Sequence, residues 1–497
     1  MRSGGAGDGG AGDGEAAGHR GGDGAAAGDR TPAGNSAATT LPCARLTARQ
    51  AIAAVADTYS EAAVPDGRGT PSGASSAPDG PLGWRGYDDA RARARERTGE
   101  DESVVTALAT IGGRETVVLS FEFRYLGGSL GERTGDRLEA AYTHAREHGL
   151  PVVSLIATGG SRMQEGMRAL TQLQRVARQS ALNRAAGLPQ LAVLRDPTTG
   201  GGWATLGAAA DVILALPGAQ VGFAGSRVRP PDADPAAYTA EGQLAAGQID
   251  AVVPPDRLRA TLQRWLQLLG TPREFHVEAV EPAPPPGALG APELPETGWG
   301  AVVRARAPGR PRAEAYLRAY FDDWEEISGD RCGGVDPGMR CGFGHRAGRT
   351  LAFAAQCGTA TRPAGFRTAA RLVRLADRLG IPVLTLVDTP GAANDAAAER
   401  AGAGAAIAET FAALATARVP VTSLLIGEGG SGGALALAAP DRLWATPDSY
   451  FSVIAPELAA AILKRDTTQI HETADQLRIR PTDLLDLGVI RGIVPPA

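Results

Sequence analysis

Short runs of apolar residues alternate with longer amphipathic stretches along most of the chain, and the clearest example in its first half lies between residues 151 and 201. The apolar run 151–156 predicts a buried strand that ends at Gly159 and Gly160. A helical pattern follows over 163–186, and a second apolar run, 191–194, leads into DPTTGG at 196–201. The order predicted is strand, glycine turn, helix, strand, glycine turn.

The second half of the chain repeats this order. The apolar run 381–387 leads into DTPGA at 388–392, a helical pattern covers 399–417, and the run 419–426 leads into GEGGSGGA at 427–434. Apolar strands between helices indicate the α/β class, with a largely parallel sheet covered by helices. Ligands in such units gather at the carboxyl ends of the strands, where both glycine turns fall.

Composition marks the domain boundaries that we expect. Residues 1–40 are rich in Gly, Ala and Asp and contain almost no large apolar side chain, which predicts a disordered tail. Residues 41–281 then form the first domain, the proline-rich stretch 282–300 is a linker, and residues 301–497 form the second domain. A chain of 497 residues is long enough for two domains that each bury a core.

Charge and cysteine content exclude several classes of function. The net charge of -5 and the lack of a basic stripe argue against nucleic-acid binding. The four cysteines include no C-x-x-C pair, so we expect neither a disulfide framework nor a bound metal. No apolar segment resembles a signal peptide or approaches the length of a membrane span, so a cytoplasmic protein without membrane contact is expected.

The glycine turns are the main candidate for chemistry. A strand that ends in Gly-Gly before a helix presents backbone N–H groups with no Cβ in the way, which suits an anion or a developing oxyanion. A single Gly-Gly pair more often serves tight strand-to-helix packing, but the repetition in matching positions favours function. The second turn also fits G-x-S-x-G, which leaves open an α/β-hydrolase with Ser431 as nucleophile, Asp448 as acid and His471 as base.

Other patterns are weaker. His144, Glu147 and His148 spell H-x-x-E-H, a spacing found in some zinc peptidases, but no third ligand is evident and a solvated surface is the expected setting. Glu325 and Glu326 are expected on the wet face of a helix. The sequence has no P-loop and no convincing side-chain base, which favours a mechanism based on backbone electrostatics.

A set of motifs in fixed order carries a family resemblance. In the first half, between about residues 82 and 269, they are FEF at 121–123, GGSLG at 127–131, GGSRMQE at 159–165, DPTTGG at 196–201 and GFAGSRV at 222–228. In the second half they are RP at 310–311, GDR at 329–331, RPAGFR at 362–367, DTPGA at 388–392, GEGGSGGA at 427–434 and FSVIAPE at 451–457. The chain resembles a fusion of the beta and alpha subunits of the acetyl-CoA carboxylase carboxyltransferases.

This resemblance implies two crotonase-like (ClpP/crotonase) ββα superhelix domains in tandem. It also implies that Gly200 and Gly201 stabilise the enolate of the acyl thioester, and that Gly432 and Gly433 bind the ureido oxygen of biotin. The substrate- and cofactor-binding residues that it implies are Gly127, Gly128, Gly159, Gly160, Arg162, Gly391, Ala392 and Ala434.

The family mechanism moves a carboxyl group from carboxybiotin, held on a separate carrier protein, to acetyl-CoA, and the product is malonyl-CoA. In it carboxybiotin releases CO2, the biotin enolate accepts an α-proton, and the thioester enolate attacks the CO2. The partners implied are a biotin carboxyl carrier protein, a biotin carboxylase, an acyl-CoA and at least a second copy of this chain. The only lysine is Lys464, so the biotinyl-lysine must belong to another chain.

The chain departs from the family pattern in two places, and these leave alternatives open. Only Cys43 stands where beta subunits carry a four-cysteine zinc ribbon, and the basic stretch expected before Arg362 is shortened to QCGTAT at 356–361. The alternatives are carboxylation of another acyl-CoA or of an acyl carrier protein thioester, a malonyl-type decarboxylase on the same fold, a non-catalytic partner protein, and the hydrolase.

Overall fold

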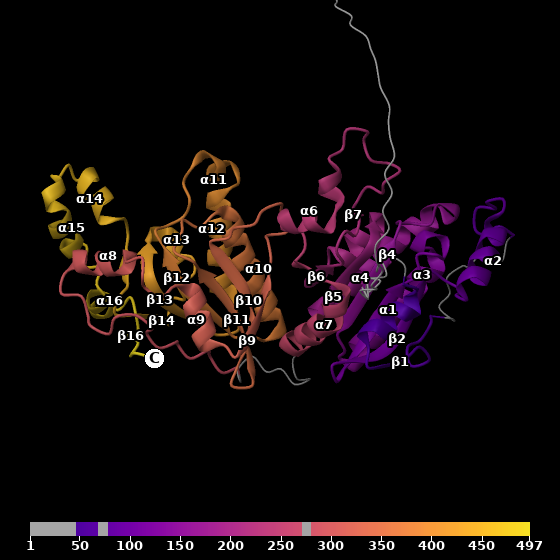
Figure 1. Cartoon of the computed structure of the whole chain (residues 1–497), viewed down its shortest axis with the longest axis horizontal. Helices are drawn as coiled ribbons and strands as arrows, with labels where there is room; N and C mark the ends of the chain where they lie inside the picture. The colour runs from indigo at the N-terminus through magenta and orange to yellow at the C-terminus, as the bar shows by residue number, and fades with distance from the viewer. Residues whose placement is uncertain (1–45, 68–77, 271–279) are drawn as a thin grey trace, which may run out of the picture. The chain divides into compact units, whose positions relative to one another are not determined.

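The computed structural model describes residues 46–67, 78–270 and 280–497, and these residues form two β-sheets with helices packed on both (Figure 1). Each sheet is built from one half of the chain. The expected tail, residues 1–40, lies outside the described residues. Among the described residues, no helix combines the length and the apolar composition needed to cross a membrane.

The first sheet runs in the order β1-β2-β3-β4-β5-β6-β8, and β7 pairs with the end of β5. β2 and β3 pair antiparallel, whereas β3, β4, β5 and β6 are parallel. The strands are β1 (Thr58–Ser60), β2 (Val104–Ile111), β3 (Arg114–Phe121), β4 (Val152–Thr158), β5 (Gln190–Thr199), β6 (Val212–Ala215), β7 (Val221–Gly222) and β8 (Ala251–Val252).

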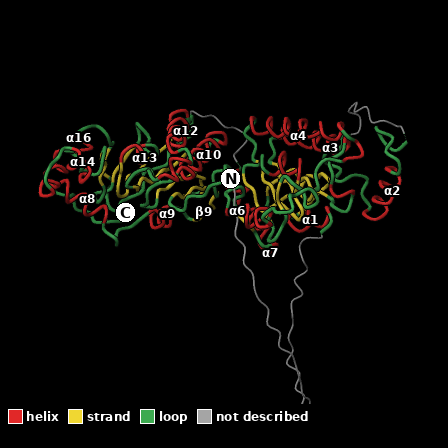
Figure 2. The backbone as a smooth tube through the Cα atoms, turned by 90° about the horizontal axis from the view of Figure 1, so that it is seen from above, coloured by secondary structure: helices red, strands yellow, loops and turns green. Residues whose placement is uncertain are grey.

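Helices cover both faces of this sheet, and Figure 2 shows α3 and α4 on one side and α1 and α7 on the other. The core on the α3 side includes Leu138, Tyr142 and Val176, and the core on the α7 side includes Leu262 and Trp265. The helices of this half are α1 (Ala48–Val55), α2 (Tyr87–Thr98), α3 (Glu132–His148), α4 (Met167–Ala185), α5 (Gly200–Gly202), α6 (Ala240–Ala245) and α7 (Pro255–Leu269).

The second sheet has the matching order β16-β14-β13-β12-β11-β10-β9, and β15 pairs with the end of β13. β10 and β11 are antiparallel, and β11, β12, β13 and β14 are parallel. The strands are β9 (Asp323–Ile327), β10 (Met339–Arg346), β11 (Arg349–Gln356), β12 (Val383–Thr389), β13 (Val421–Gly430), β14 (Leu443–Ala445), β15 (Tyr450–Ser452) and β16 (Gly492–Ile493).

α10 packs on one face of the second sheet through Phe366 and Val373, and α9 packs on the other through Tyr316 and Leu317. The helices of this half are α8 (Gly298–Arg306), α9 (Ala313–Tyr320), α10 (Pro363–Leu379), α11 (Ala396–Arg400), α12 (Ala403–Thr416), α13 (Ser431–Leu435), α14 (Pro456–Ile462), α15 (Ile470–Gln476) and α16 (Pro481–Asp486).

The two halves share an irregularity that shapes the ends of their central strands. The pairing of β4 with β5 shifts register between Ile156 and Thr158, and the pairing of β12 with β13 shifts between Val387 and Thr389. A register shift bends the strand and re-aims the residues that follow it. The same bend therefore precedes both predicted glycine turns.

The tandem α/β fold predicted from the sequence is confirmed, but two local predictions were wrong. Glu325 and Glu326 lie on the edge strand β9, not on a helix, because pairing with β10 extends this charged segment. The helix expected over 399–417 is two helices, α11 and α12, separated at Gly402, whose φ of 79° does not suit a continuous helix. The stretch expected as a linker, 282–300, contains the start of α8.

Candidate functional site

Gly159, Gly160, Gly200 and Gly201 form a cluster of turns that we call the first glycine corner. It lies where β4 and β5 end side by side. Gly159 and Gly160 follow β4, and Gly200 and Gly201 follow β5. A Cβ built on Gly200 would lie 3.0 Å from the Cα of Gly160, and Gly200 has a φ of +63°. Both the close approach and the left-handed backbone require glycine here.

A third turn joins this corner. The N–H of Gly159 donates to the carbonyl of Gly127 at 2.9 Å, and a Cβ on Gly128 would lie 2.1 Å from the carbonyl of Ala157. The fold thus brings together three glycine pairs that are far apart in the sequence. They are the predicted residues Gly127, Gly128, Gly159, Gly160, Gly200 and Gly201.

The backbone N–H groups of the first corner divide into two kinds. Gly160 donates to Thr158 Oγ1 at 3.0 Å and Gly200 donates to the carbonyl of Phe223 at 3.1 Å, so both are occupied. In the described part of the chain, the N–H groups of Ser161 and Gly201 have no acceptor. Donors left over in this way are available to a ligand oxygen.

The second glycine corner consists of Gly391, Ala392, Gly432 and Gly433. It repeats the arrangement of the first at the ends of β12 and β13. Gly391 donates to Thr389 Oγ1 at 3.1 Å, as Gly160 does to Thr158 in the first half. A Cβ on Gly433 would lie 2.3 Å from the backbone nitrogen of Ala392, so these two turns are also in contact. By contrast, a Cβ on Gly432 would meet nothing within 4 Å.

More N–H groups are left over at the second corner than at the first. Within residues 280–497, no acceptor pairs with the N–H of Ala392, Gly432 or Gly433, whereas the N–H of Ala434 belongs to the first turn of α13. These three residues were all predicted from the sequence as site residues. Their donors lie on two adjacent turns, an arrangement that suits a negatively charged oxygen.

A cavity of about 870 Å³ adjoins the first corner. Its lining includes Gly127, Gly159 and Thr199, together with the largely exposed side chains of Phe223 and Val228. Apolar walls next to backbone donors are typical of a site for an organic ligand of moderate size.

Arg162 is buried beneath this corner and holds its turns together. Its guanidinium pairs with Glu102 and, at 3.2 Å, with Glu165, and it donates to the carbonyl of Ser129 at 2.8 Å. Burial alone would raise the pKa of Glu102, but the charge of Arg162, the hydrogen bonds from Arg162 and from the Ser103 N–H, and the charge of Arg137 together lower this pKa to about 2. Arg162 adjoins the cavity, yet its side chain is 1% exposed.

A buried carboxylate, Asp388, lies beneath the second corner. Its Oδ1 accepts from Arg310 Nη2 at 2.5 Å and from the N–H of Glu428 at 3.1 Å. Burial raises the pKa of Asp388 in spite of the Arg310 charge. The carboxylate thus ties the end of β12 to the end of β13.

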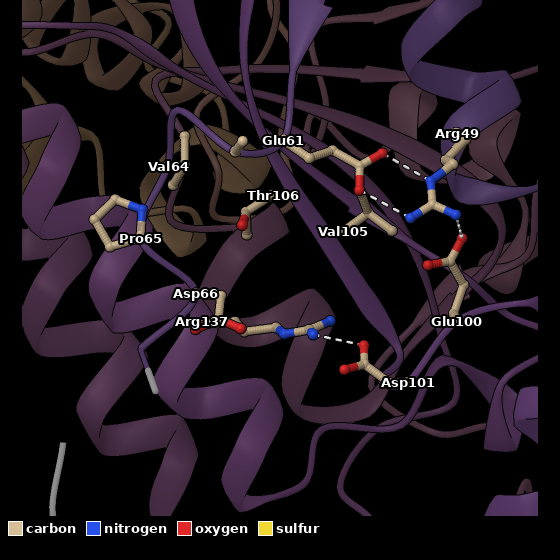
Figure 3. A pocket seen from close by; sticks show the side chains of 11 residues that line it. Arg49, Glu61, Val64, Pro65, Asp66, Glu100, Asp101, Val105, Thr106 and Arg137 are labelled. Carbon is tan, nitrogen blue, oxygen red and sulfur yellow. Dashed lines mark hydrogen bonds and ion pairs between the residues drawn. The ribbon is translucent and has the colours of Figure 1, made fainter. Parts of the chain in front are cut away.

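A second hollow in the first half, of about 480 Å³, contains none of the predicted site residues (Figure 3). Arg49 pairs there with Glu61 at 2.7 Å and with Glu100 at 3.0 Å, and Arg137 pairs with Asp101 at 2.6 Å. Both of its guanidinium groups have carboxylate partners, which makes this hollow a weaker candidate than the cavity beside the corner.

The elements of the hydrolase alternative are not joined by any contact among the described residues. His471 stacks on Trp299 with ring centroids 4.9 Å apart, and Asp448 Oδ1 is buried without a hydrogen-bond partner. Ser431 has a φ of 53°, as a strained strand-to-helix turn requires. The backbone fits a nucleophile elbow, but within the described ranges no base contacts the serine.

The H-x-x-E-H pattern lies at the carboxyl end of α3. The rings of His144 and His148 are 4.1 Å apart, and burial together with the neighbouring His148 lowers the pKa of His144. In the part of the chain that the structure describes, no group of three or more His, Cys, Asp or Glu residues is arranged to hold a metal ion. Cys43 lies outside that part.

Sequence reasoning assigned no role to several residues that build the two corners. The matched threonines Thr158 and Thr389 precede corresponding turns, and an alignment of the two halves would have revealed them. Asp388 was seen only as part of a motif, and its partner Arg310 lies 78 residues away in the sequence. No local pattern predicts such a pair.

Family comparisons cover nearly all of the described chain. Residues 81–274 match the family model described as carboxyl transferase domain, and residues 296–497 match the one described as acetyl co-enzyme A carboxylase carboxyltransferase-like. The acetyl-coenzyme A carboxylase carboxyl transferase subunits beta/alpha of Salinispora arenicola are 40% identical over 479 residues, which is 91% of this chain and 82% of that protein.

A second relative carries a broader description. The probable biotin-dependent acyl-coenzyme A carboxylase beta3 subunit of Mycobacterium tuberculosis is 37% identical over 414 residues, covering 81% of this chain and 82% of that protein. Among solved structures, transcarboxylase 12S has a TM-score of 0.73 at 22% identity, with 91% of this chain and 87% of that chain covered. A single-chain long-chain acyl-CoA carboxylase has a TM-score of 0.63 at 21% identity, with 80% and 40% covered.

The two family models and the relatives together show a biotin-dependent acyl-CoA carboxyltransferase, built here as two α/β domains in tandem. The chain belongs to the acetyl-CoA carboxylase carboxyltransferase family, with beta-like and alpha-like halves in one polypeptide. The family membership inferred from the motifs is confirmed.

Proposed function

We propose that this enzyme transfers the carboxyl group of carboxybiotin to acetyl-CoA, and that the two glycine corners supply the electrostatic stabilisation. The observation that carries the proposal is the set of backbone N–H groups without acceptors at both corners, including those of Gly201 and Gly433. Backbone donors held in place before the reaction stabilise an oxyanion without reorganisation.

In this proposal each corner serves one reactant. Gly200 and Gly201 bind the thioester oxygen as negative charge develops on it, and the adjoining cavity of about 870 Å³ holds the acyl-CoA. Gly432 and Gly433 bind the ureido oxygen of biotin, where the open space beside Gly432 admits the ring. Carboxybiotin supplies the carboxyl group, while the chain itself provides binding, orientation and N–H donors.

The site is completed by a second copy of the chain. Large apolar side chains stand exposed around both corners: Met163, Phe223 and Val228 beside the first, and Leu435 and Val453 beside the second. Exposed apolar surface of this kind marks a contact surface. We infer that the first corner of one protomer faces the second corner of its partner, in a homodimer or a higher oligomer.

Separate chains supply the remaining steps. A biotin carboxyl carrier protein brings carboxybiotin, and a biotin carboxylase charges it in the cytoplasm. Both corners have glycine where two turns approach closely, as at Gly200 beside Gly160 and at Gly433 beside Ala392. This favours a catalytic role over that of a non-catalytic partner protein.

A direct assay tests the reaction and its substrate. Purified enzyme is given malonyl-CoA with free biotin, and carboxybiotin formation is measured; the forward reaction then compares acetyl-CoA, propionyl-CoA and longer acyl-CoAs with a carboxylated carrier. We expect acetyl-CoA to have the highest kcat/KM. Malonyl-CoA consumption without biotin would instead identify a decarboxylase, and a preference for a longer acyl-CoA would reject acetyl-CoA as the substrate.

The hydrolase alternative has its own test in Ser431→Ala. The backbone of the turn does the work in the proposed mechanism, so this variant should keep carboxyl transfer within about twofold of the wild type. A nucleophilic serine would instead lose about 10³-fold or more on removal. Steady-state assays with malonyl-CoA and biotin, and with a chromogenic ester, distinguish the two outcomes.

A further inference from the structure

At three matching places, the second corner has buried polar side chains where the first corner has apolar ones. Gln356 is the last residue of β11, and Phe121 is the last residue of β3, which has the same place in the first sheet. Both are fully buried. At this matching core position the first half therefore has a phenylalanine and the second half has a glutamine.

Two further matching positions also differ in polarity between the halves. Thr361 forms an isolated parallel bridge with Ala392, and Leu130 forms the matching bridge with Ser161. Asp388 directly precedes Thr389, and Ala157 holds the matching place before Thr158. A packed core has no need of polar side chains in these places, and a buried polar group is costly unless it is hydrogen-bonded.

Gln356 uses its whole amide to join three segments. Its Nε2 donates to the carbonyl of Gly433 and to Thr361 Oγ1, each at 3.1 Å, and its Oε1 accepts from the N–H of Asp388 at 3.3 Å. One side chain thus contacts the ends of β11 and β12 and the glycine turn after β13. Since the Gly433 carbonyl belongs to the same peptide plane as the Ala434 N–H, the contact fixes the direction of that plane.

We propose that Gln356 is a positioning residue: by holding the peptide that follows Gly433, it keeps the N–H donors of Gly432 and Gly433 in the geometry used for carboxyl transfer. The proposal rests on the proposed function of the second corner. Gln356 touches no reactant, because it is fully buried beneath the turn. A preorganised donor loses much of its effect when it moves by a fraction of an ångström, because the reaction must then reorganise it.

The test compares Gln356→Met with Gln356→Glu and a matched control. Methionine keeps the length of the side chain and removes its polar atoms, whereas glutamate keeps the acceptor and removes the Nε2 donor. Gln190→Met is the control, because Gln190 is also buried in a central strand. Its Oε1 accepts from Ser180 Oγ at 2.8 Å and its Nε2 donates to the Ser180 carbonyl at 2.7 Å, at the opposite end of β5 from the corner.

Two measurements are made on each full-length variant. The first is kcat and KM for malonyl-CoA with biotin as acceptor, and the second is amide hydrogen exchange, by mass spectrometry, of the peptide covering 428–437. We expect both Gln356 variants to lose about 10- to 100-fold in kcat with KM for malonyl-CoA within about twofold. Exchange should rise in 428–437 but not in 196–206. Gln190→Met should keep kcat within about twofold.

The outcomes are decisive in either direction. Unchanged exchange in 428–437, or an equal loss of kcat in Gln190→Met, overturns the positioning role. If Gln356→Met does not fold, the same two measurements, of kcat and of exchange in 428–437, are decided on Gln356→Glu. Should the wild type show no carboxyl transfer at all, the proposed function fails, yet the exchange measurement still decides whether Gln356 holds the turn.

Discussion

Replacing Gly433 by valine is expected to lower carboxyl transfer by at least about 10²- to 10³-fold, the usual effect of losing one oxyanion donor. A Cβ at this position would lie 2.3 Å from the backbone nitrogen of Ala392 and 2.8 Å from the carbonyl carbon of Gly391. Both neighbours are backbone, so one of the two turns must move. Either movement takes N–H groups away from the oxygen that they bind. The measurement is kcat/KM for malonyl-CoA with biotin.

Two further glycine variants separate this effect from a general loss of stability. Gly404→Val lies on α12, where a Cβ meets nothing within 4 Å, and it should leave turnover unchanged. Gly432→Ala also meets nothing in the chain, so it should fold normally, and any loss of activity reports a ligand beside Gly432. Wild-type turnover in Gly433→Val would refute the role of the second corner.

Glu102→Gln is expected to lower the free energy of unfolding by roughly 3–5 kcal/mol, because it leaves the buried Arg162 without its main partner. Glu102 and Arg162 are both almost fully buried, and Glu102 also accepts from the N–H of Ser103 at 2.6 Å. The matched control is Glu139→Gln, whose partner Arg175 is partly exposed, and it should cost no more than about 1 kcal/mol. Urea denaturation followed by circular dichroism measures both.

The cost of Glu102→Gln should depend on pH in a defined direction. The pKa of Glu102 falls from 4.5 to about 2 in the folded protein, since the charge and hydrogen bonds of Arg162, with those of its other neighbours, together outweigh the effect of burial. A lowered folded-state pKa stabilises the protein above pH 4.5, and this contribution is lost as pH falls towards 2. The difference between wild type and variant should therefore be constant near pH 7 and shrink below pH 4.5. A difference that grows on acidification would contradict this coupling.

Much of the fold was predictable because the buried strands of the parallel sheets are continuous apolar runs. The runs at 151–156, 191–194, 381–387 and 419–426 became β4, β5, β12 and β13. The prediction failed where tertiary pairing overrides local pattern. The charged residues Glu325 and Glu326 are held as a strand by β10, and β5 continues through Asp196 and Pro197 to pair with β7.

The candidate site was predictable in its glycines but not in what supports them. Duplication and family motifs pointed to Gly200, Gly201, Gly432 and Gly433, and the structure places each pair against a second turn of its own half. The supporting residues Gln356 and Glu102 have no local signature, because their partners are 77 and 60 residues distant. Arg162 was predicted to bind a substrate or cofactor, and its burial now favours a role through the turns that it holds.

The most direct test of the two-corner site is complementation between protomers. Gly201→Val and Gly433→Val chains carry different affinity tags, are co-expressed, and the mixed oligomers are purified on both tags. If each site combines the first corner of one protomer with the second corner of another, a mixed dimer keeps one intact site of two, and about half of the wild-type turnover returns. No recovery above the two single variants would contradict the account.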